Sequence, residues 1–91
     1  MVLATRAEID EFLSKNDRWS LEKDELVATA TLADFVEAMG LVNRIALLAE
    51  KANHHPDIAI SWNKVTLRLS THSEGGITAR DLDLAARLPL T

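Results

Sequence analysis

The chain has 91 residues, of which 47% are hydrophobic, so it is long enough for one core and too apolar to remain disordered. It contains no cysteine, which excludes disulfides, thiolate metal sites and cysteine nucleophiles. Its net charge is -4, and its ten Lys and Arg residues are scattered among fourteen Asp and Glu residues. This distribution argues against direct nucleic-acid binding, which requires clustered basic side chains.

The sequence also predicts where the protein works and how it is stabilised. No apolar run is long enough to cross a bilayer, and the first residues lack the basic and then apolar pattern of a targeting segment. We therefore expect a soluble, cytoplasmic protein with no membrane partner. A domain of this size buries a modest share of its surface, so we also expect self-association to add to its stability.

The first part of the chain predicts one helix and a hairpin. Thr5-Arg6-Ala7-Glu8 is a capping-box pattern, in which a Thr hydroxyl and a Glu carboxylate satisfy free amides at a helix start. Asn16-Asp17 end this helix. Residues 19–21 and 26–31 have the pattern of two strands, and the charged turn 22–25 joins them.

The strongest periodic segment runs from residue 32 or 34 to about residue 53 and predicts a long central helix. Its expected buried face consists of Phe35, Ala38, Met39, Val42, Ile45, Ala46 and Ala49. The other apolar residues of the helix, which fall outside that face, are Val36, Leu41, Leu47 and Leu48. The helix therefore has more apolar surface than one sheet face requires, which favours a subunit contact.

The second part of the chain predicts another hairpin and a short helix. Apolar residues alternate with other residues over 58–62 and again over 65–69, as they do in strands. Thr78-Ala79-Arg80-Asp81 is a second capping-box pattern, and Pro89 ends the helix that begins there.

The expected element order is therefore α-β-β-α-β-β-α. A four-stranded antiparallel sheet with three helices packed on one face accommodates this order, because hairpins pair locally and the apolar helix faces need a sheet to cover. The predicted fold class is α+β, and residues 1–91 form a single domain with no linker or internal repeat.

All three histidines lie in the second half of the chain, and two of them follow the long helix. Glu50 and His54 are four residues apart, so we expect this carboxylate to accept an imidazole N–H and to fix its tautomer. Pro56 cannot continue the helix and biases His55 away from helical angles, which predicts a sharp corner there. His72 follows the last strand. Imidazole has an unperturbed pKa of about 6.5 and can both give and take a proton near neutral pH.

Each of these residues also has a simpler interpretation. A Glu four residues before a His is often a surface pair, Trp62 alone is typical of a core, and Asp81 can serve as a helix cap alone. The three histidines with Glu50 or Asp81 form an alternative zinc or non-haem iron set. Adjacent histidines rarely point both rings at one ion, so we expect no metal. Arg80 and Arg87 are expected to be solvated charges.

Several segments together resemble the pterin-4a-carbinolamine dehydratase family. The family pattern has an acid four residues before His-His-Pro, an aromatic residue shortly after, a His beyond the next strand and an Asp in the last helix. The matching segments are Glu50-Lys51-Ala52-Asn53-His54-His55-Pro56-Asp57, Trp62-Asn63-Lys64-Val65, Leu69-Ser70-Thr71-His72, Gly75-Gly76-Ile77-Thr78 and Asp81. Further similarity at Trp19, Asp34-Phe35 and residues 46–50 extends the resemblance over nearly the whole chain.

The resemblance implies a hydro-lyase that needs no metal and no cofactor. Its reaction is the dehydration of 4a-hydroxytetrahydrobiopterin to quinonoid dihydropterin, which recycles a tetrahydrobiopterin-type cofactor after aromatic amino-acid hydroxylation. His54 resembles the principal acid/base residue, and His55 and His72 complete the catalytic set. The residues expected to bind the pterin are Glu50, Asn53, Pro56, Trp62, Thr71 and Asp81. Asn53 stands where animal members tend to carry Asp.

The resemblance leaves the assembly and two alternative functions open. Family members assemble as dimers or tetramers, so we expect a homodimer or a homotetramer. Some members also act as dimerisation cofactors of transcription factors, which makes a non-catalytic, coactivator-type binding protein one alternative. A pterin dehydratase that acts in molybdopterin metabolism is the other.

Overall fold

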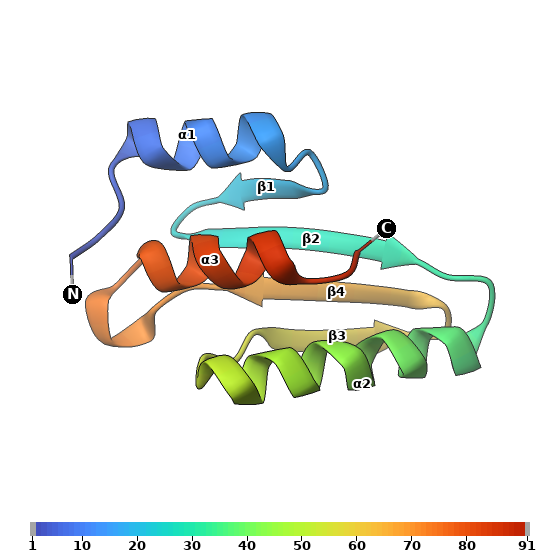
Figure 1. The fold of residues 1–91 in the computed structure, drawn as a ribbon. Helices are drawn as coiled ribbons and strands as arrows, with labels where there is room; N and C mark the ends of the chain where they lie inside the picture. The colour runs from blue at the N-terminus through green and yellow to red at the C-terminus, as the bar shows by residue number, and fades with distance from the viewer. Residues whose placement is uncertain (1, 91) are drawn as a thin grey trace.

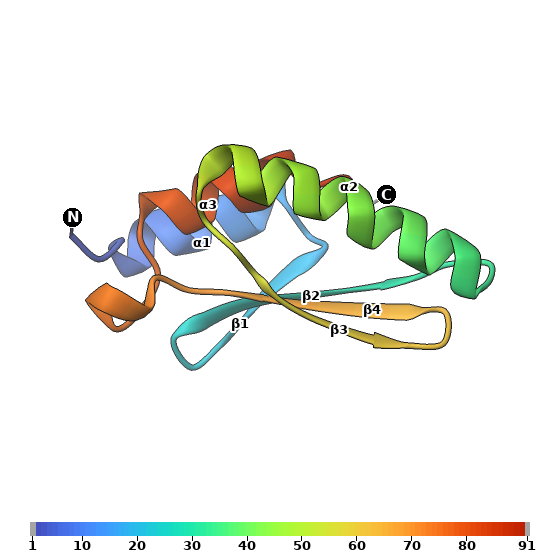
Figure 2. The same cartoon turned by 90° about the horizontal axis from the view of Figure 1, so that it is seen from below.

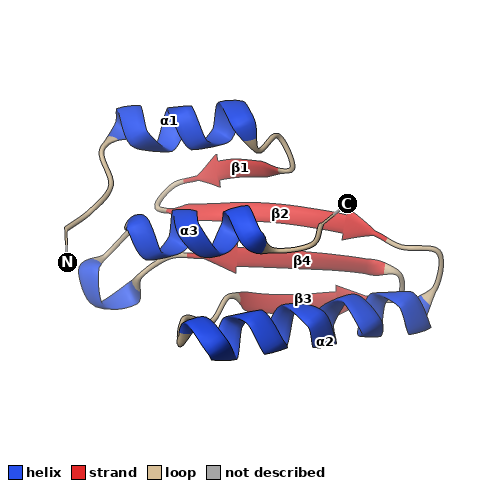
Figure 3. Cartoon of the chain, viewed as in Figure 1, coloured by secondary structure: helices blue, strands red, loops and turns tan. Residues whose placement is uncertain are grey.

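The computed structural model of the chain describes residues 2–90, and its elements follow the predicted order (Figure 1, Figure 3). A single turn of 3-10 helix, η1, is the one element that the sequence pattern did not predict. The elements are α1 (Arg6–Lys15), β1 (Trp19–Glu22), β2 (Glu25–Thr31), α2 (Phe35–Ala52), β3 (Asp57–Ser61), β4 (Lys64–Leu69), η1 (His72–Glu74) and α3 (Ala79–Arg87).

The four strands form one antiparallel sheet in the order β1-β2-β4-β3. The two hairpins pair locally, and β2 and β4 join them in the middle, with Leu26 opposite Leu69. All three helices lie on one face of this sheet, and Figure 2 shows that the other face has no helix over it. The predicted α+β class and its arrangement are therefore confirmed.

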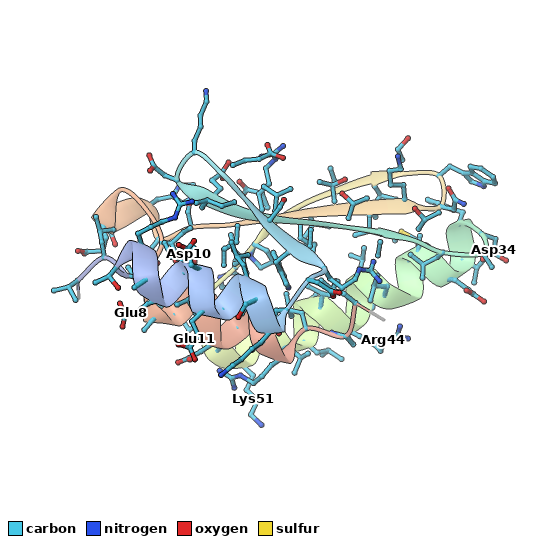
Figure 4. All side chains as sticks on the ribbon, turned by 90° about the horizontal axis from the view of Figure 1, so that it is seen from above. Glu8, Asp10, Glu11, Asp34, Arg44 and Lys51 are labelled. Carbon is cyan, nitrogen blue, oxygen red and sulfur yellow. The ribbon has the colours of Figure 1, made fainter. Side chains whose placement is uncertain are left out.

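The capping boxes that were predicted at two helix starts are both present. The Glu8 N–H donates to Oγ1 of Thr5 at 3.1 Å, and the Thr5 N–H donates to Oε1 of Glu8 at 2.8 Å. At α3, Thr78 and Asp81 make the equivalent pair of contacts. Charged side chains of α1 and α2 lie outside: Glu8, Glu11 and Lys51 project away from the sheet (Figure 4).

The core lies between the sheet and the helices, and it corrects the predicted orientation of α2. Leu41 is buried against the sheet, whereas Phe35, Met39 and Ala46, which were predicted on the buried face, are exposed. The residues of α2 that are buried are Ala38, Leu41, Ile45 and Ala49. The prediction was wrong here because α2 is apolar on more than one side, so periodicity alone does not show which stripe meets the sheet.

The turn between β3 and β4 corrects a second prediction. The strand expected over 58–62 ends at Ser61, which pairs with Lys64, so Trp62 and Asn63 form a two-residue turn. Trp62 has a φ of 52° and is 69% exposed. A two-residue hairpin turn that matches the twist of its strands needs a positive φ at its first central residue, and here Trp62 takes that position. Glycine or asparagine usually fills that position, so Trp62 gave no turn signal; the turn residue in the sequence is Asn63, one position later.

Within residues 2–90, none of the helices combines the length and the apolar character that crossing a membrane requires.

Candidate active site

The first part of the candidate site is the exit of α2. Asn53 adopts the left-handed conformation, with φ 50° and ψ 43°. The N–H of His54 then donates to the carbonyl of Ala49 at 3.1 Å, which closes the helix as in a Schellman cap. Asparagine is one of the few residues other than glycine that adopt this conformation readily. The sharp corner predicted at the histidine pair is thus made one residue earlier, and Pro56 leads from it into β3.

The ring of His54 contacts a carboxylate on another helix. Nε2 of His54 lies 2.5 Å from Oδ1 of Asp81, in the first turn of α3. The His54 side chain is 11% exposed and the Asp81 side chain is fully buried. The predicted partner, Glu50, was therefore wrong. The i to i+4 spacing places two side chains together only inside a helix, and the left-handed Asn53 changes the chain direction before His54 is reached.

Glu50 instead pairs with His55. Nε2 of His55 lies 2.8 Å from Oε1 of Glu50. These side chains are 58% and 82% exposed, so water competes for both of them. The two adjacent histidines therefore differ in kind. His54 is held in a buried contact with a carboxylate, and His55 makes a solvated one.

Asp81 is the centre of a small buried polar network. Its second oxygen, Oδ2, accepts a hydrogen bond from the Thr71 hydroxyl and one from the Thr78 N–H, both at 2.8 Å. The Thr71 and Thr78 hydroxyl oxygens are themselves 2.8 Å apart. Asp81 thus caps α3 and contacts His54 at once. Because the Thr71 hydroxyl is buried and bonded to two protein groups, this geometry does not favour the predicted contact between Thr71 and substrate.

Arg80 makes a second link between α3 and the exit of α2. Its Nη2 donates to the backbone carbonyl of Asn53 at 2.5 Å. The prediction that Arg80 is only a solvated charge was therefore wrong. Arg80 thus holds the backbone just before His54, and the next residue, Asp81, holds the ring of His54. Sequence reasoning missed this role because nothing in the spacing of Arg80 indicates a contact 27 residues earlier in the chain.

The remaining predicted site residues lie at two opposite ends of the sheet. β3 begins and β4 ends at the same end, since Asp57 pairs with Arg68. The exit of α2, η1 and the start of α3 are all at that end (Figure 1). His72 is exposed in η1, one residue after Thr71. Trp62 lies at the other end of β3, roughly 16 Å away for five extended residues. Within one chain, Trp62 is therefore not brought together with the histidines.

Two further observations describe the surroundings. A cavity of about 250 Å³ lies between the start of the chain, the β1–β2 turn and residues 75–77, and none of the three histidines lines it. Among residues 2–90, no three His, Asp or Glu side chains gather closely enough to hold a metal ion. The groups at the candidate site are ones that exchange protons: an oriented imidazole, a buried carboxylate and two exposed imidazoles.

This fold and this site define a small α+β protein in which a buried carboxylate orients a histidine that is available for acid/base chemistry. The family model described as Pterin 4 alpha carbinolamine dehydratase matches residues 3–89. The chain belongs to that family, which confirms the resemblance seen in the sequence.

Individual relatives agree with this assignment. A protein from Chloroflexus aurantiacus is 49% identical over 84 residues, which is 92% of this chain and 90% of the relative. One from Thermomicrobium roseum is 50% identical over 82 residues, 90% and 88% of the two chains. Both carry the name pterin-4-alpha-carbinolamine dehydratase as a provisional assignment. A solved structure described as a transcriptional coactivator/pterin dehydratase from Brucella melitensis is 33% identical, with a TM-score of 0.88 over 94% of each chain.

Proposed function

We propose that this protein dehydrates 4a-hydroxytetrahydrobiopterin to quinonoid dihydropterin, with His54 as the principal acid/base residue. The observation that carries the proposal is the buried pair between Nε2 of His54 and Oδ1 of Asp81. A carboxylate that accepts the N–H of an imidazole fixes its tautomer and stabilises the imidazolium that forms when the ring takes up a proton. Family membership, with relatives about half identical in sequence, supports the choice of substrate.

The reaction needs one proton to be removed and one to be donated. With its proton on Nε2, neutral His54 has a lone pair on Nδ1 that removes the pterin N–H proton. The electrons of that N–H bond form a C=N double bond, and the C–O bond at position 4a breaks. An imidazolium, His55 or His72 in the protonated form, gives its proton to the departing hydroxyl, which leaves as water. Two proton transfers and one bond cleavage therefore balance without a metal or a cofactor.

The other predicted ligands extend this proposal. Glu50, Asn53, Pro56 and Asp81 surround the exit of α2, so we keep them as residues that shape the pterin site. Trp62 reaches such a site only if it comes from another copy of the chain, because its own hairpin turn lies at the far end of β3. We propose that the protein works as a homodimer or homotetramer in the cytoplasm, beside a pathway of aromatic amino-acid hydroxylation.

A stopped-flow assay of 4a-carbinolamine decay tests the proposal. We expect the wild-type protein to accelerate decay over the non-enzymatic reaction, and His54→Ala to lower turnover by at least about 100-fold, the contribution typical of general acid/base catalysis. Circular dichroism of His54→Ala checks that the fold is intact. Turnover at the wild-type rate in a folded His54→Ala variant would sink the assignment of His54.

One observation favours a second function. The Brucella melitensis structure is described as both a coactivator and a dehydratase. If the wild-type protein gives no acceleration in the assay, the coactivator-type binding protein is the better hypothesis. Acceleration restricted to pterins of molybdopterin metabolism selects the remaining alternative.

A further inference from the structure

Three polar side chains are buried beneath the His54 ring. Thr78 and Asp81 have no exposed surface and Thr71 is 6% exposed. Burying a polar group is costly unless it finds hydrogen-bond partners. Among residues 2–90, no buried side-chain nitrogen or oxygen lacks one. These three residues therefore form a closed network rather than a set of independent contacts.

The protons of this network have one consistent arrangement. A carboxylate only accepts hydrogen bonds, so the Thr71 hydroxyl donates its single proton to Oδ2 of Asp81. The contact between the two hydroxyl oxygens must then use the proton of Thr78, which donates to Thr71. The Thr78 oxygen in turn accepts from the N–H of Arg80 at 3.3 Å. This series of hydrogen bonds thus runs from the Arg80 N–H through the hydroxyls of Thr78 and Thr71 to Oδ2 of Asp81.

This arrangement leaves Asp81 one orientation. Oδ2 is occupied by two donors, the Thr71 hydroxyl and the Thr78 N–H, so the carboxylate presents Oδ1 to His54. If the Thr78 hydroxyl is removed, the Thr71 hydroxyl loses its donor and gains freedom to rotate away from Asp81. The Thr78 N–H then remains as the one fixed donor to Oδ2, so Oδ1 is held less firmly towards Nε2 of His54.

We infer that Thr78 is a positioning residue, which acts through Thr71 and Asp81 to keep the His54 proton on Nε2 and its lone pair on Nδ1. This inference rests on the proposed function for its effect on turnover. Its effect on the His54 tautomer is independent of any activity, and the two can be measured separately.

Thr78 is also the N-cap of α3, so its substitution weakens the helix whatever happens at His54. The chain provides a matched control, because Thr5 is the N-cap of the other capping box, at the start of α1. Thr5→Val and Thr78→Val remove the same hydroxyl from the same motif. Only the second change touches the network under His54. A loss of stability common to both variants is the effect of the cap.

The decisive measurement is ¹⁵N NMR of the imidazole at a pH where the ring is neutral. We expect the wild-type protein, Thr5→Val and Thr78→Ser to hold His54 with its proton on Nε2. We expect Thr78→Val to give a mixture of the two tautomers. Thr71→Val removes the donor to Oδ2 but leaves the Thr78 hydroxyl in place to accept from the Arg80 N–H, and it is expected to give a similar mixture. If Thr78→Val does not fold, Thr71→Val and Thr78→Ser carry the test.

The kinetic measurement follows in the stopped-flow assay. We expect Thr78→Val to lower kcat by roughly tenfold, as is typical when an outer partner that orients a histidine is lost, with little change in KM. Thr78→Ser is expected to restore the wild-type rate. A wild-type tautomer in a folded Thr78→Val variant, or in Thr71→Val, overturns the inference. If the wild-type protein has no activity but these variants still show the tautomer shift, the proposed function is overturned and the inference about Thr78 stands.

Discussion

The ring of His54 contacts a carboxylate that lies 27 residues later in the chain and is fully buried. Burial matters because solvent screens the pair less than it screens an exposed pair, so the orientation of the ring is better defined. His55, one residue away, pairs with an exposed Glu50 and lacks this protection. Two chemically identical side chains in succession therefore have different physical environments, and His54 is the better candidate for a defined proton transfer.

Asp81→Asn is the sharpest test of this difference at the level of a single residue. The amide has nearly the same shape but no charge, so it no longer stabilises an imidazolium at His54 and presents either N–H or C=O to Nε2. We expect turnover in the stopped-flow assay to fall by at least about 100-fold, because a carboxylate-to-amide change beside a catalytic imidazole can cost up to about 10⁴-fold. Thermal unfolding measures how much stability the change removes.

Asp83→Asn provides the control for charge removal on the same helix. Asp83 is exposed, so its carboxylate is solvated. We expect wild-type turnover from this variant. Equal turnover of Asp81→Asn and the wild-type protein would contradict the role of the buried carboxylate.

The sequence predicted which residues form the site better than it predicted how they pair. The motif brought His54, His55, Glu50 and Asp81 together as candidates, and the structure places all four near the exit of α2. The pairing depended on one backbone angle at Asn53, which helical periodicity does not report. The network of Thr71 and Thr78 could not be predicted either, because it requires the relative placement of β4 and α3.

At the scale of elements, both capping boxes correctly predicted the start of a helix, because the signal is local: a side chain satisfies backbone amides within three residues. The errors occurred where local signals were absent. Trp62 continued the strand alternation into a turn, and Leu41 belonged to one of several apolar stripes on α2. In both cases the sequence pattern fitted two structures about equally well: strand or turn at Trp62, and one or another buried stripe on α2. Tertiary packing determines which of them forms.

The exit of α2 gives a prediction at this scale. Asn53→Gly keeps the left-handed conformation at no steric cost, so we expect the backbone path to His54 and the wild-type kcat to be retained. Asn53→Val places a β-branched side chain at a positive φ, and we expect it to lower the free energy of unfolding by about 1–3 kcal/mol. Chemical denaturation and the stopped-flow assay measure the two effects.

The same pair of variants tests the predicted contact between the Asn53 side chain and the pterin. A raised KM in Asn53→Gly, with kcat unchanged, supports that contact. An unchanged KM assigns Asn53 to the backbone turn alone. A large loss of kcat in a stable Asn53→Gly variant contradicts the expectation.

At the scale of the whole molecule, the site depends on the topology of the sheet. The antiparallel pairing of β3 with β4 brings the start of one strand and the end of the other to the same end of the sheet. The segments that carry the histidines flank this hairpin, and α3 begins at the same end and runs back over the sheet (Figure 1). This explains why residues 50–57 and 71–81 form one region while Trp62, between them in sequence, does not.

The outer side of α2 is the basis of the last prediction, which concerns assembly. Val36 and Leu47 are 77% and 74% exposed, and their spacing of three helical turns places them on the same side of the helix. Gly40 lies between them, with open space where a Cβ would be, so a second helix can approach closely.

We therefore expect a homodimer or homotetramer in which the combined change Val36→Glu and Leu47→Glu lowers the number of subunits, because it brings like charges together at the contact. Light scattering after size-exclusion chromatography measures the mass against the 10.1 kDa of one chain. Val2→Glu, at an exposed apolar residue that does not belong to α2, is expected to keep the wild-type mass. A monomeric wild-type protein at micromolar concentration would contradict the prediction, and an unchanged mass in the double variant would move the contact to another surface.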